Sequence, residues 1–337
     1  MPEGIEAFWF VFSPDGQHQA GRSLDALARA GSLQQAVDQY GPFDLAVSHM
    51  FCTPGLGEIR AEIENDLGVR LFGSPPAVID CAQSKAATRA VMERAGVNIA
   101  KGASIAPGQD ALAVADNIDL PLIVKPDSTD NSVGVSLVHE KDDLEGAIAE
   151  ARRHCDTIVM EAFIPGREIR AAVIERDNGL YCPAMIEYTV SDEAPIRRFD
   201  DKLDTDADGR PIGKSTGSAI RTICPADVDP SLCQRIEEAA IAAHEALGAR
   251  DFSLFDFRID ARTGEPVLLE ACPYWSLSPK SIISEMATAD GEDLEALALD
   301  VLNRAARAAN KAANPKPDSR SPMRPVSISA PLGAAAI

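Results

Sequence analysis

The chain has 337 residues, of which 45% are hydrophobic, and its formal net charge is -20. This length is too great for one simple core and predicts two or three compact units. The acidic balance argues against nucleic acid or an anionic membrane as a bulk partner, because phosphate-bearing surfaces attract the opposite sign. An anionic substrate would therefore need locally placed Lys and Arg side chains.

Seven cysteines are scattered along the chain and form no CxxC pair. An odd number without paired spacing argues against a disulfide framework or a zinc site and favours a reducing compartment. The apolar run at residues 7–12 is too short for a membrane helix and has no basic segment before it. We expect a soluble, cytoplasmic protein.

Residues 1–80 are predicted to form a small unit of alternating strands and helices. Strands are expected at residues 5–12, 43–48 and 69–73, with helices at 23–40 and around 59–67. Such alternation predicts a parallel sheet with a crevice at the strand ends. His49, directly after the second strand, could contact a substrate there, although a lone histidine is more often structural.

Helical spacing resumes from Ser84 to Gly96, and a phosphate-binding pattern follows at residues 120–135, LPLIVKPDSTDNSVGV. An apolar strand delivers Lys125 to its end, and small polar residues lead from there to Gly134. Small residues let backbone N–H groups approach phosphate oxygens, while the lysine supplies a positive charge. The residue order of a Walker A loop is missing, and a plain hairpin with a solvated lysine would have a similar sequence.

A strand at residues 157–162 then ends close to Glu161, and a short apolar connector leads to Glu168 and another strand. The connector backbone could bond a purine base, and Glu168 could accept from ribose hydroxyls, although a generic turn between strands would look the same. Residues 191–218 are polar and poor in large apolar side chains, which predicts a mobile loop over a site. This loop carries dense positive charge, which includes Arg197 and Lys202.

The stretch from Leu254 to Pro279 predicts a hairpin with strands at 254–259 and 266–269 and a Thr-Gly turn between them. Alternation puts Asp256 on one face with Leu254 and Arg258, and the phenylalanines on the other. Asp256 and Glu270, at matching heights on paired strands, suit a Mg²⁺ ion. The alternative is a pair of ordinary solvated hairpin residues. A last helix is expected at residues 291–309, and the Pro-, Ser- and Ala-rich residues 313–337 are expected to be disordered.

Four blocks in order carry a resemblance to a known family: SKAATRAVMERAGV, LPLIVKPDSTDNSVGVSLV, VMEAFIPGREI and FDFRIDARTGEPVLLEA. Together they resemble the ATP-grasp superfamily and, within it, the D-alanine:D-alanine ligases. The resemblance implies a mixed α/β and α+β architecture with the ATP-grasp fold. An N-terminal parallel α/β substrate domain at residues 1–80 would precede two α+β subdomains, at 81–160 and 161–312, that clamp ATP.

The resemblance also implies a set of site residues, each at a position that matches the family. The resemblance implies that Lys85 and Lys125 bind the ATP phosphates, and that Asn131 and Ser132 lie in the loop that closes over them. It also implies that Glu161, Phe163 and Ile164 hold the adenine and that Glu168 holds the ribose. The implied metal ligands are Asp256, Glu270 and Cys272, and the implied catalytic residues are Ser132, Lys202 and Arg258.

Two of these positions depart from the family. The ligases carry Arg two residues before the metal-binding Asp, where this chain has Leu254, and Arg258 on the same strand face is the candidate substitute. The family's metal-binding Asn is Cys272 here, and a neutral thiol is a poor partner for hard Mg²⁺. The number of ions, one or two, stays open, with Mn²⁺ as another candidate. After Cys272, Tyr274 and Trp275 could line a pocket for a larger group or pack in the core.

We therefore expect an ATP- and Mg²⁺-dependent ligase that joins a carboxylate to an amine through an acyl phosphate and releases ADP. Its partners would be small-molecule carboxylates and amines, such as amino acids, short peptides or related metabolites. A homodimer stays open, since ligases of this kind are often dimers. One alternative is the D-alanine:D-alanine ligase of cell-wall synthesis, and another is a degenerate nucleotide-binding protein without ligase activity.

Overall fold

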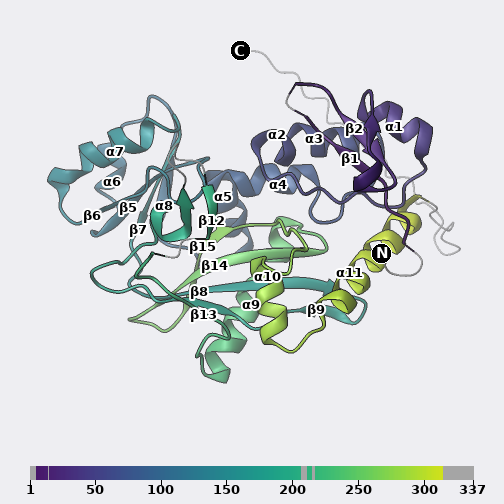
Figure 1. Cartoon of the computed structure of the whole chain (residues 1–337). Helices are drawn as coiled ribbons and strands as arrows, with labels where there is room; N and C mark the ends of the chain where they lie inside the picture. The colour runs from purple at the N-terminus through teal and green to yellow at the C-terminus, as the bar shows by residue number, and fades with distance from the viewer. Residues whose placement is uncertain (1–4, 14, 206–210, 215–216, 314–337) are drawn as a thin grey trace, which may run out of the picture.

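The computed structural model describes residues 5–13, 15–205, 211–214 and 217–313. The described chain is built around two larger antiparallel sheets with their covering helices, preceded by a smaller N-terminal part (Figure 1). Among these residues, no helix combines the length and the apolar character that crossing a bilayer would require.

The N-terminal part is built on three short antiparallel strands, β1 (Trp9–Val11), β2 (Gln19–Gly21) and β3 (Ala28–Arg29). Two of the strands expected in this part, at residues 43–48 and 69–73, meet in parallel as predicted, through the isolated bridge between Ala46 and Leu71. The strand expected at residues 5–12 differs, because β1 pairs antiparallel with β2, which in turn pairs antiparallel with β3. The helical elements of this part are η1 (Leu24–Ala26), α1 (Leu33–Tyr40), α2 (Thr53–Leu56), α3 (Glu58–Ala61) and the π-helix η2 (Glu62–Asp66).

The four-stranded sheet has the order β4-β7-β5-β6. Its strands are β4 (Gly102–Ile105), β5 (Leu122–Pro126), β6 (Ser136–Val138) and β7 (Ile158–Ala162). Apolar residues of one face, such as Val124 and Met160, pack with Leu144 and Ala147 of the covering helix. Alternation then turns Lys125 to the opposite face. The helical elements here are α6 (Ala111–Ala115), η3 (Lys141–Asp143) and α7 (Leu144–Arg152).

The C-terminal sheet has the order β13-β10-β8-β14-β15, with β9 paired to β8. Its strands are β8 (Gly166–Arg176), β9 (Gly179–Tyr181), β10 (Ile186–Tyr188), β13 (Thr222–Ile223), β14 (Phe252–Asp260) and β15 (Pro266–Ala271). The hairpin predicted from the alternation around Asp256 is therefore confirmed. Its turn includes Gly264 at a φ of 73°, a backbone conformation that favours glycine.

Helices cover both faces of this sheet. On one face, Phe255 and Phe257 pack against Val78 of α4 (Pro76–Gln83), Met92 of α5 (Lys85–Ala95) and Ile236 of α9 (Pro230–Leu247). On the other face, an apolar cluster joins part of the sheet to α10 (Ile282–Ala289) and α11 (Leu294–Ala313). The remaining part of that second face carries charged side chains and is the floor of the candidate site.

The segment expected to be a loop at residues 191–218 contains regular structure. It forms the short helix α8 (Phe199–Lys202) and the paired strands β11 (Leu203–Thr205) and β12 (Pro211–Lys214). The expected tail, apart from Ala313 at the end of α11, lies outside the described residues. The domain limits at residues 80, 160 and 312 stay predictions.

Candidate active site

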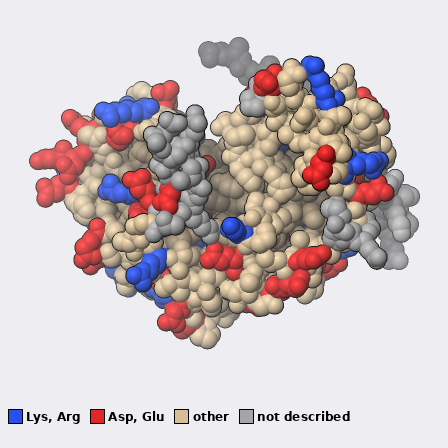
Figure 2. Space-filling view, in the orientation of Figure 1, with Lys and Arg blue, Asp and Glu red and all other residues tan. Residues whose placement is uncertain are grey.

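A cleft with an empty volume of about 790 Å³ lies between the four-stranded sheet and the C-terminal sheet. Figure 2 shows the hollow, with acidic side chains gathered mostly at the outer edges of the visible face. The cleft brings together every residue of the predicted site except Asn131 and Cys272, namely Lys85, Lys125, Ser132, Glu161, Phe163, Ile164, Glu168, Lys202, Asp256, Arg258 and Glu270.

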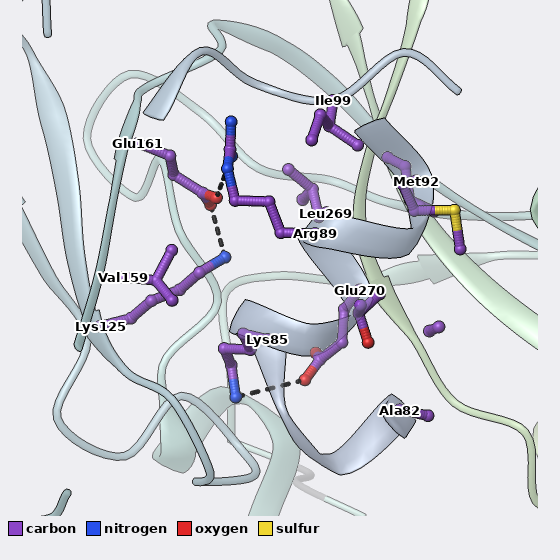
Figure 3. Close-up of a pocket in the computed structure, with 13 residues that line it drawn as sticks. Ala82, Lys85, Arg89, Met92, Ile99, Lys125, Val159, Glu161, Leu269 and Glu270 are labelled. Atoms are coloured by element: carbon purple, nitrogen blue, oxygen red, sulfur yellow. Dashed lines mark hydrogen bonds and ion pairs between the residues drawn. The ribbon is translucent and has the colours of Figure 1, made fainter. Parts of the chain in front are cut away.

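A smaller pocket adjoins this cleft and shares Lys85, Lys125, Glu161 and Glu270 with it. This pocket holds three basic side chains around two carboxylates (Figure 3). Lys125 Nζ lies 2.5 Å from Glu161 Oε1, and Arg89 Nη1 lies 3.9 Å from the other oxygen of that carboxylate. Lys85 Nζ lies 3.8 Å from Glu270 Oε1. The sequence reasoning missed Arg89, although it follows Lys85 by four residues on one helix and must therefore share its face.

The first turn of α5 fixes the position of Lys85. Ser84 caps the helix by accepting from Ala87 N at 3.0 Å, and its hydroxyl donates to Asp127 at 2.9 Å. Asp127, directly after β5, also accepts from Ala86 N at 2.7 Å. The start of α5 and the end of β5 are thus tied together, which brings Lys85 and Lys125 to the same end of the cleft.

The loop after β5 has an unusual backbone. Asn131 and Ser132 both adopt the left-handed conformation, with φ of 55° and 61°, and Gly134 follows with a φ of 72°. Such conformations are uncommon for residues other than glycine and concentrate at functional sites. Ser132 lines the cleft, whereas Asn131 does not. A closing role for this loop stays a prediction.

A row of charged residues crosses the floor of the cleft. Arg170 on β8, Asp256 on β14 and Glu270 on β15 are direct partners in the strand registers, so all three share one face. Arg170 donates from Nε and Nη2 to the two oxygens of Asp256, and Arg197 Nη2 lies 3.4 Å from Asp256 Oδ2. Burial alone would raise the pKa of Asp256, but the charges of Arg170, Arg197 and Lys202 together more than offset it, so the pKa is lowered.

A second row involves Glu168, the predicted ribose ligand. Arg197 Nε donates to Glu168 Oε1 at 2.5 Å, and Arg258 Nη2 lies 3.3 Å from Oε2. Arg197 also stacks on the Tyr188 ring, with its guanidinium carbon 3.5 Å from the centroid. Arg258, the candidate substitute for the family's arginine, thus pairs with Glu168. The arginine that pairs with Asp256 is Arg170. The sequence reasoning missed Arg170, although it follows Glu168 by two residues in a strand and so had to share its face.

Lys202 of α8 lines the cleft near these rows. Burial lowers its pKa, the positive charge of Arg197 lowers it further, and the charges of Glu270 and Asp256 oppose the shift. The lysine is therefore enclosed with both acids of the predicted metal pair. This position suits a cation that faces a polyanionic ligand.

The donor set fits a divalent ion in one place and not in another. Asp256 has both carboxylate oxygens bonded by Arg170, whereas Glu270 faces Lys85 at 3.8 Å and keeps 28% of its side chain exposed. Burial, followed by the charge of Glu270, raises the pKa of the Cys272 thiol to about 12, so this thiol stays neutral. Within the described residues, no group of three or more His, Cys, Asp or Glu side chains could hold a metal by itself. An ion on Glu270 with ligand phosphate oxygens fits, and one on Asp256 or Cys272 does not.

Two further sequence questions concern Tyr274 and Trp275. Trp275 is buried, packs edge-on to Phe252 at 5.6 Å and donates from Nε1 to Ser281 Oγ at 2.9 Å, so its role is packing. Tyr274 lies against Phe51, with ring centroids 5.9 Å apart. His49 is exposed and does not line the cleft.

D-alanine–D-alanine ligases are among the proteins to which this chain is similar. A D-alanine–D-alanine ligase from Acidiphilium cryptum is 36% identical over 225 residues, which cover 67% of this chain and 68% of the relative. One from Granulibacter bethesdensis is 34% identical and covers 64% and 65%. The chain thus spans about two thirds of the length of these curated relatives.

Solved structures of the same kind share the fold. The D-alanine–D-alanine ligase of Bacillus anthracis superposes with a TM-score of 0.66 at 18% identity, covering 84% of this chain and 86% of that one. The VanG D-Ala:D-Ser ligase of Enterococcus faecalis gives a TM-score of 0.67 at 21% identity, covering 84% and 80%. The family model described as D-ala D-ala ligase C-terminus matches residues 91–303, more than half of the chain. The chain therefore belongs to this ligase family and has the ATP-grasp fold.

Proposed function

We propose that the protein is an ADP-forming ligase that uses ATP to join two amino acids, and that D-alanine supplies both the carboxylate and the amine. The sequence alone favoured a broader carboxylate–amine ligase, with D-alanine:D-alanine ligase as the alternative. The names of the relatives support the alternative better. The observation that carries the proposal is the convergence of Lys85, Lys125 and Lys202 on one cleft of a chain whose net charge is -20.

The cleft supplies the groups that phosphoryl transfer needs. Lys85, at the first turn of α5, and Lys125, at the end of β5, would bind the ATP phosphates through their positive charges. Phe163 and Ile164 would contact the adenine. Glu168 could accept from the ribose hydroxyls, because each of its oxygens keeps a second lone pair beside its arginine bond.

The chemistry proceeds in two steps. One carboxylate oxygen of the first substrate attacks the γ-phosphorus, ADP leaves and an acyl phosphate forms. The amine of the second substrate then attacks the acyl carbon, phosphate leaves and the amine loses a proton. The contribution of the protein is positioning and charge stabilisation by its fixed cations, since this reaction needs little covalent help. A Mg²⁺ ion held by Glu270 and phosphate oxygens would neutralise part of the charge on the transferring group.

The test is phosphate release from ATP and Mg²⁺ with D-alanine, and then with a matrix of other amino acids and small carboxylates. We expect D-alanine to stimulate release and a dipeptide to appear by mass spectrometry. Glu270→Gln should reduce the rate by about 100-fold or more. Glu265→Gln is the matched control, because Glu265 is an exposed acid at the turn of the same hairpin.

Each other result has a distinct meaning. Stimulation by a different pair of substrates, with D-alanine inactive, would restore the broader ligase reading. ATP binding without any stimulated release across the matrix would favour a nucleotide-binding protein that does not ligate. A Glu270→Gln variant as active as the wild type would exclude the proposed cleft.

A further inference from the structure

Both carboxylate oxygens of Asp256 already accept hydrogen bonds from a positively charged group in this structure. Its two oxygens accept from Nε and Nη2 of Arg170, and the Asp256 side chain is 6% exposed. Arg197 approaches the same carboxylate at 3.4 Å. Two guanidinium groups therefore surround the acid that the sequence suggested as a metal ligand.

The fold holds Arg170 in this position. The residue sits directly opposite Asp256 in the β8–β14 register, in the middle of an eleven-residue strand. Its guanidinium carbon lies 5.5 Å from the centroid of the Tyr188 ring, which adds a cation–π contact from β10. A guanidinium keeps its charge at any pH that the protein survives, and its planar fork matches a carboxylate with two parallel hydrogen bonds.

Glu270 has a different environment, although it is the direct partner of Asp256 on β15. Its carboxylate pairs with Lys85, and the 3.8 Å between Lys85 Nζ and Glu270 Oε1 is longer than a direct hydrogen bond. Its side chain is 28% exposed. An incoming cation can thus reach Glu270 without displacing an arginine, whereas at Asp256 it would have to displace Arg170 or lie against it.

We propose that Arg170 is a built-in cation of the cleft, which replaces a divalent ion at Asp256 and leaves one ion site, at Glu270. The proposal rests on the proposed function, because the nucleotide phosphates supply the other ligands of that ion. Arg170 is then a positioning residue that holds Asp256 as a structural carboxylate. The number of metal ions bound per chain in the nucleotide complex distinguishes this arrangement, with one ion, from one with two.

The experiment counts Mn²⁺ ions bound per chain, by electron paramagnetic resonance, in the complex with a non-hydrolysable ATP analogue. We expect one ion in the wild type. Arg170→Met, which removes both short hydrogen bonds to Asp256 and leaves only the longer contact from Arg197, should bind a second ion. Arg176→Met is the matched control, because Arg176 lies on the same strand but pairs with Glu292 at 2.7 Å, outside the cleft, and this variant should bind one ion.

A second variant keeps the test valid even if Arg170→Met fails to fold. Asp256→Asn should also bind one Mn²⁺ ion, because its amide oxygen can still accept from Arg170. Glu270→Gln should bind none, because it lacks the carboxylate that holds the ion. Two ions in the wild type, one of them lost in Asp256→Asn, would overturn the proposal while the proposed function stands. Nucleotide binding is followed separately by calorimetry, and a wild type that binds no nucleotide would overturn the proposed function and this proposal together.

Discussion

Each of four acidic side chains in the cleft lies against a basic partner: Glu161 with Lys125, Glu168 with Arg197, Asp256 with Arg170, and Glu270 with Lys85. A buried charge is costly unless it is paired. The pairs therefore let the cleft keep many charged groups before any ligand enters. Glu270 has the longest of the four contacts, so its carboxylate is the one held least closely by its basic partner.

Cys272 provides a prediction at the same scale. Burial, and then the charge of Glu270, raises the pKa of its thiol to about 12. At pH 8 the thiol is therefore neutral and should react slowly with iodoacetamide, because the thiolate is the nucleophile. Cys52, which is exposed, is the internal control and should be alkylated first.

Peptide mass spectrometry after timed alkylation measures both rates in one sample. The reaction of Cys272 should accelerate as the pH rises toward 12, within the range where the protein stays folded. Alkylation of Cys272 as fast as that of Cys52 at pH 8 would show that the thiol is accessible and ionised. Such a result would restore Cys272 as a candidate metal ligand.

Among the secondary-structure elements, α5 has the largest share in the site, because it carries both Lys85 and Arg89 along one face. Its cap, Ser84, also bonds Asp127 at the end of β5. Ser84→Ala should cost about 1 kcal/mol of unfolding free energy from loss of the cap. It should also raise the Kd for ATP several-fold, because Lys85 is no longer held beside Lys125.

Asp110→Ala separates these two effects. Asp110 caps α6 by accepting from Leu112 N and Ala113 N, and it does not line the cleft. Its loss should cost a similar free energy of unfolding, about 1 kcal/mol, without a change in ATP affinity. Urea unfolding and calorimetry measure the two quantities. Equal ATP affinity in the Ser84 and Asp110 variants would mean that the cap does not position Lys85.

The elements also show where the sequence was sufficient for prediction. The pairing of Asp256 with Glu270 followed from period-two alternation and a short turn, both of which are local signals. The pairing of Asp256 with Arg170 depends on the neighbour of β14, which lies 86 residues earlier in the chain. Alternation placed Arg170 on a face with Glu168, but no local pattern says which strand lies beside it.

The N-terminal part was predicted less well for a related reason. A helix was expected across residues 23–40, yet α1 begins at Leu33, after a capping box in which Ser32 and Gln35 bond each other's backbone. This Ser-x-x-Gln signal was present in the sequence and was overlooked. The residues before it form η1 and β3, where β3 pairs antiparallel with β2. Strands of two or three residues carry too little alternation to be recognised.

At the scale of the whole molecule, the two residues before β14 connect the parts of the chain. Arg250 bonds Glu64 of η2 at 2.8 Å, and Asp251 accepts from Arg70 at 2.8 Å and from the Gly73 backbone N–H at 2.8 Å. Asp251 also pairs with Arg304 of α11 at 3.0 Å. The same strand that carries Asp256 into the cleft is thus anchored at its start to the N-terminal part and to the last helix.

Asp251 should therefore contribute strongly to stability. It is 1% exposed, and its φ of 65° is a conformation that Asn also tolerates, so Asp251→Asn removes the charge with little backbone strain. Arg70 and Arg304 would lose a buried partner, and we expect the free energy of unfolding to fall by about 3 kcal/mol.

Asp177→Asn is the matched control, because Asp177 pairs with Arg307 of the same helix α11 at 2.6 Å, but both side chains are exposed. Its loss should cost less than about 1 kcal/mol. If urea unfolding gives equal losses for the two variants, Asp251 does not connect the parts, and the position of β14 must be fixed by apolar packing alone.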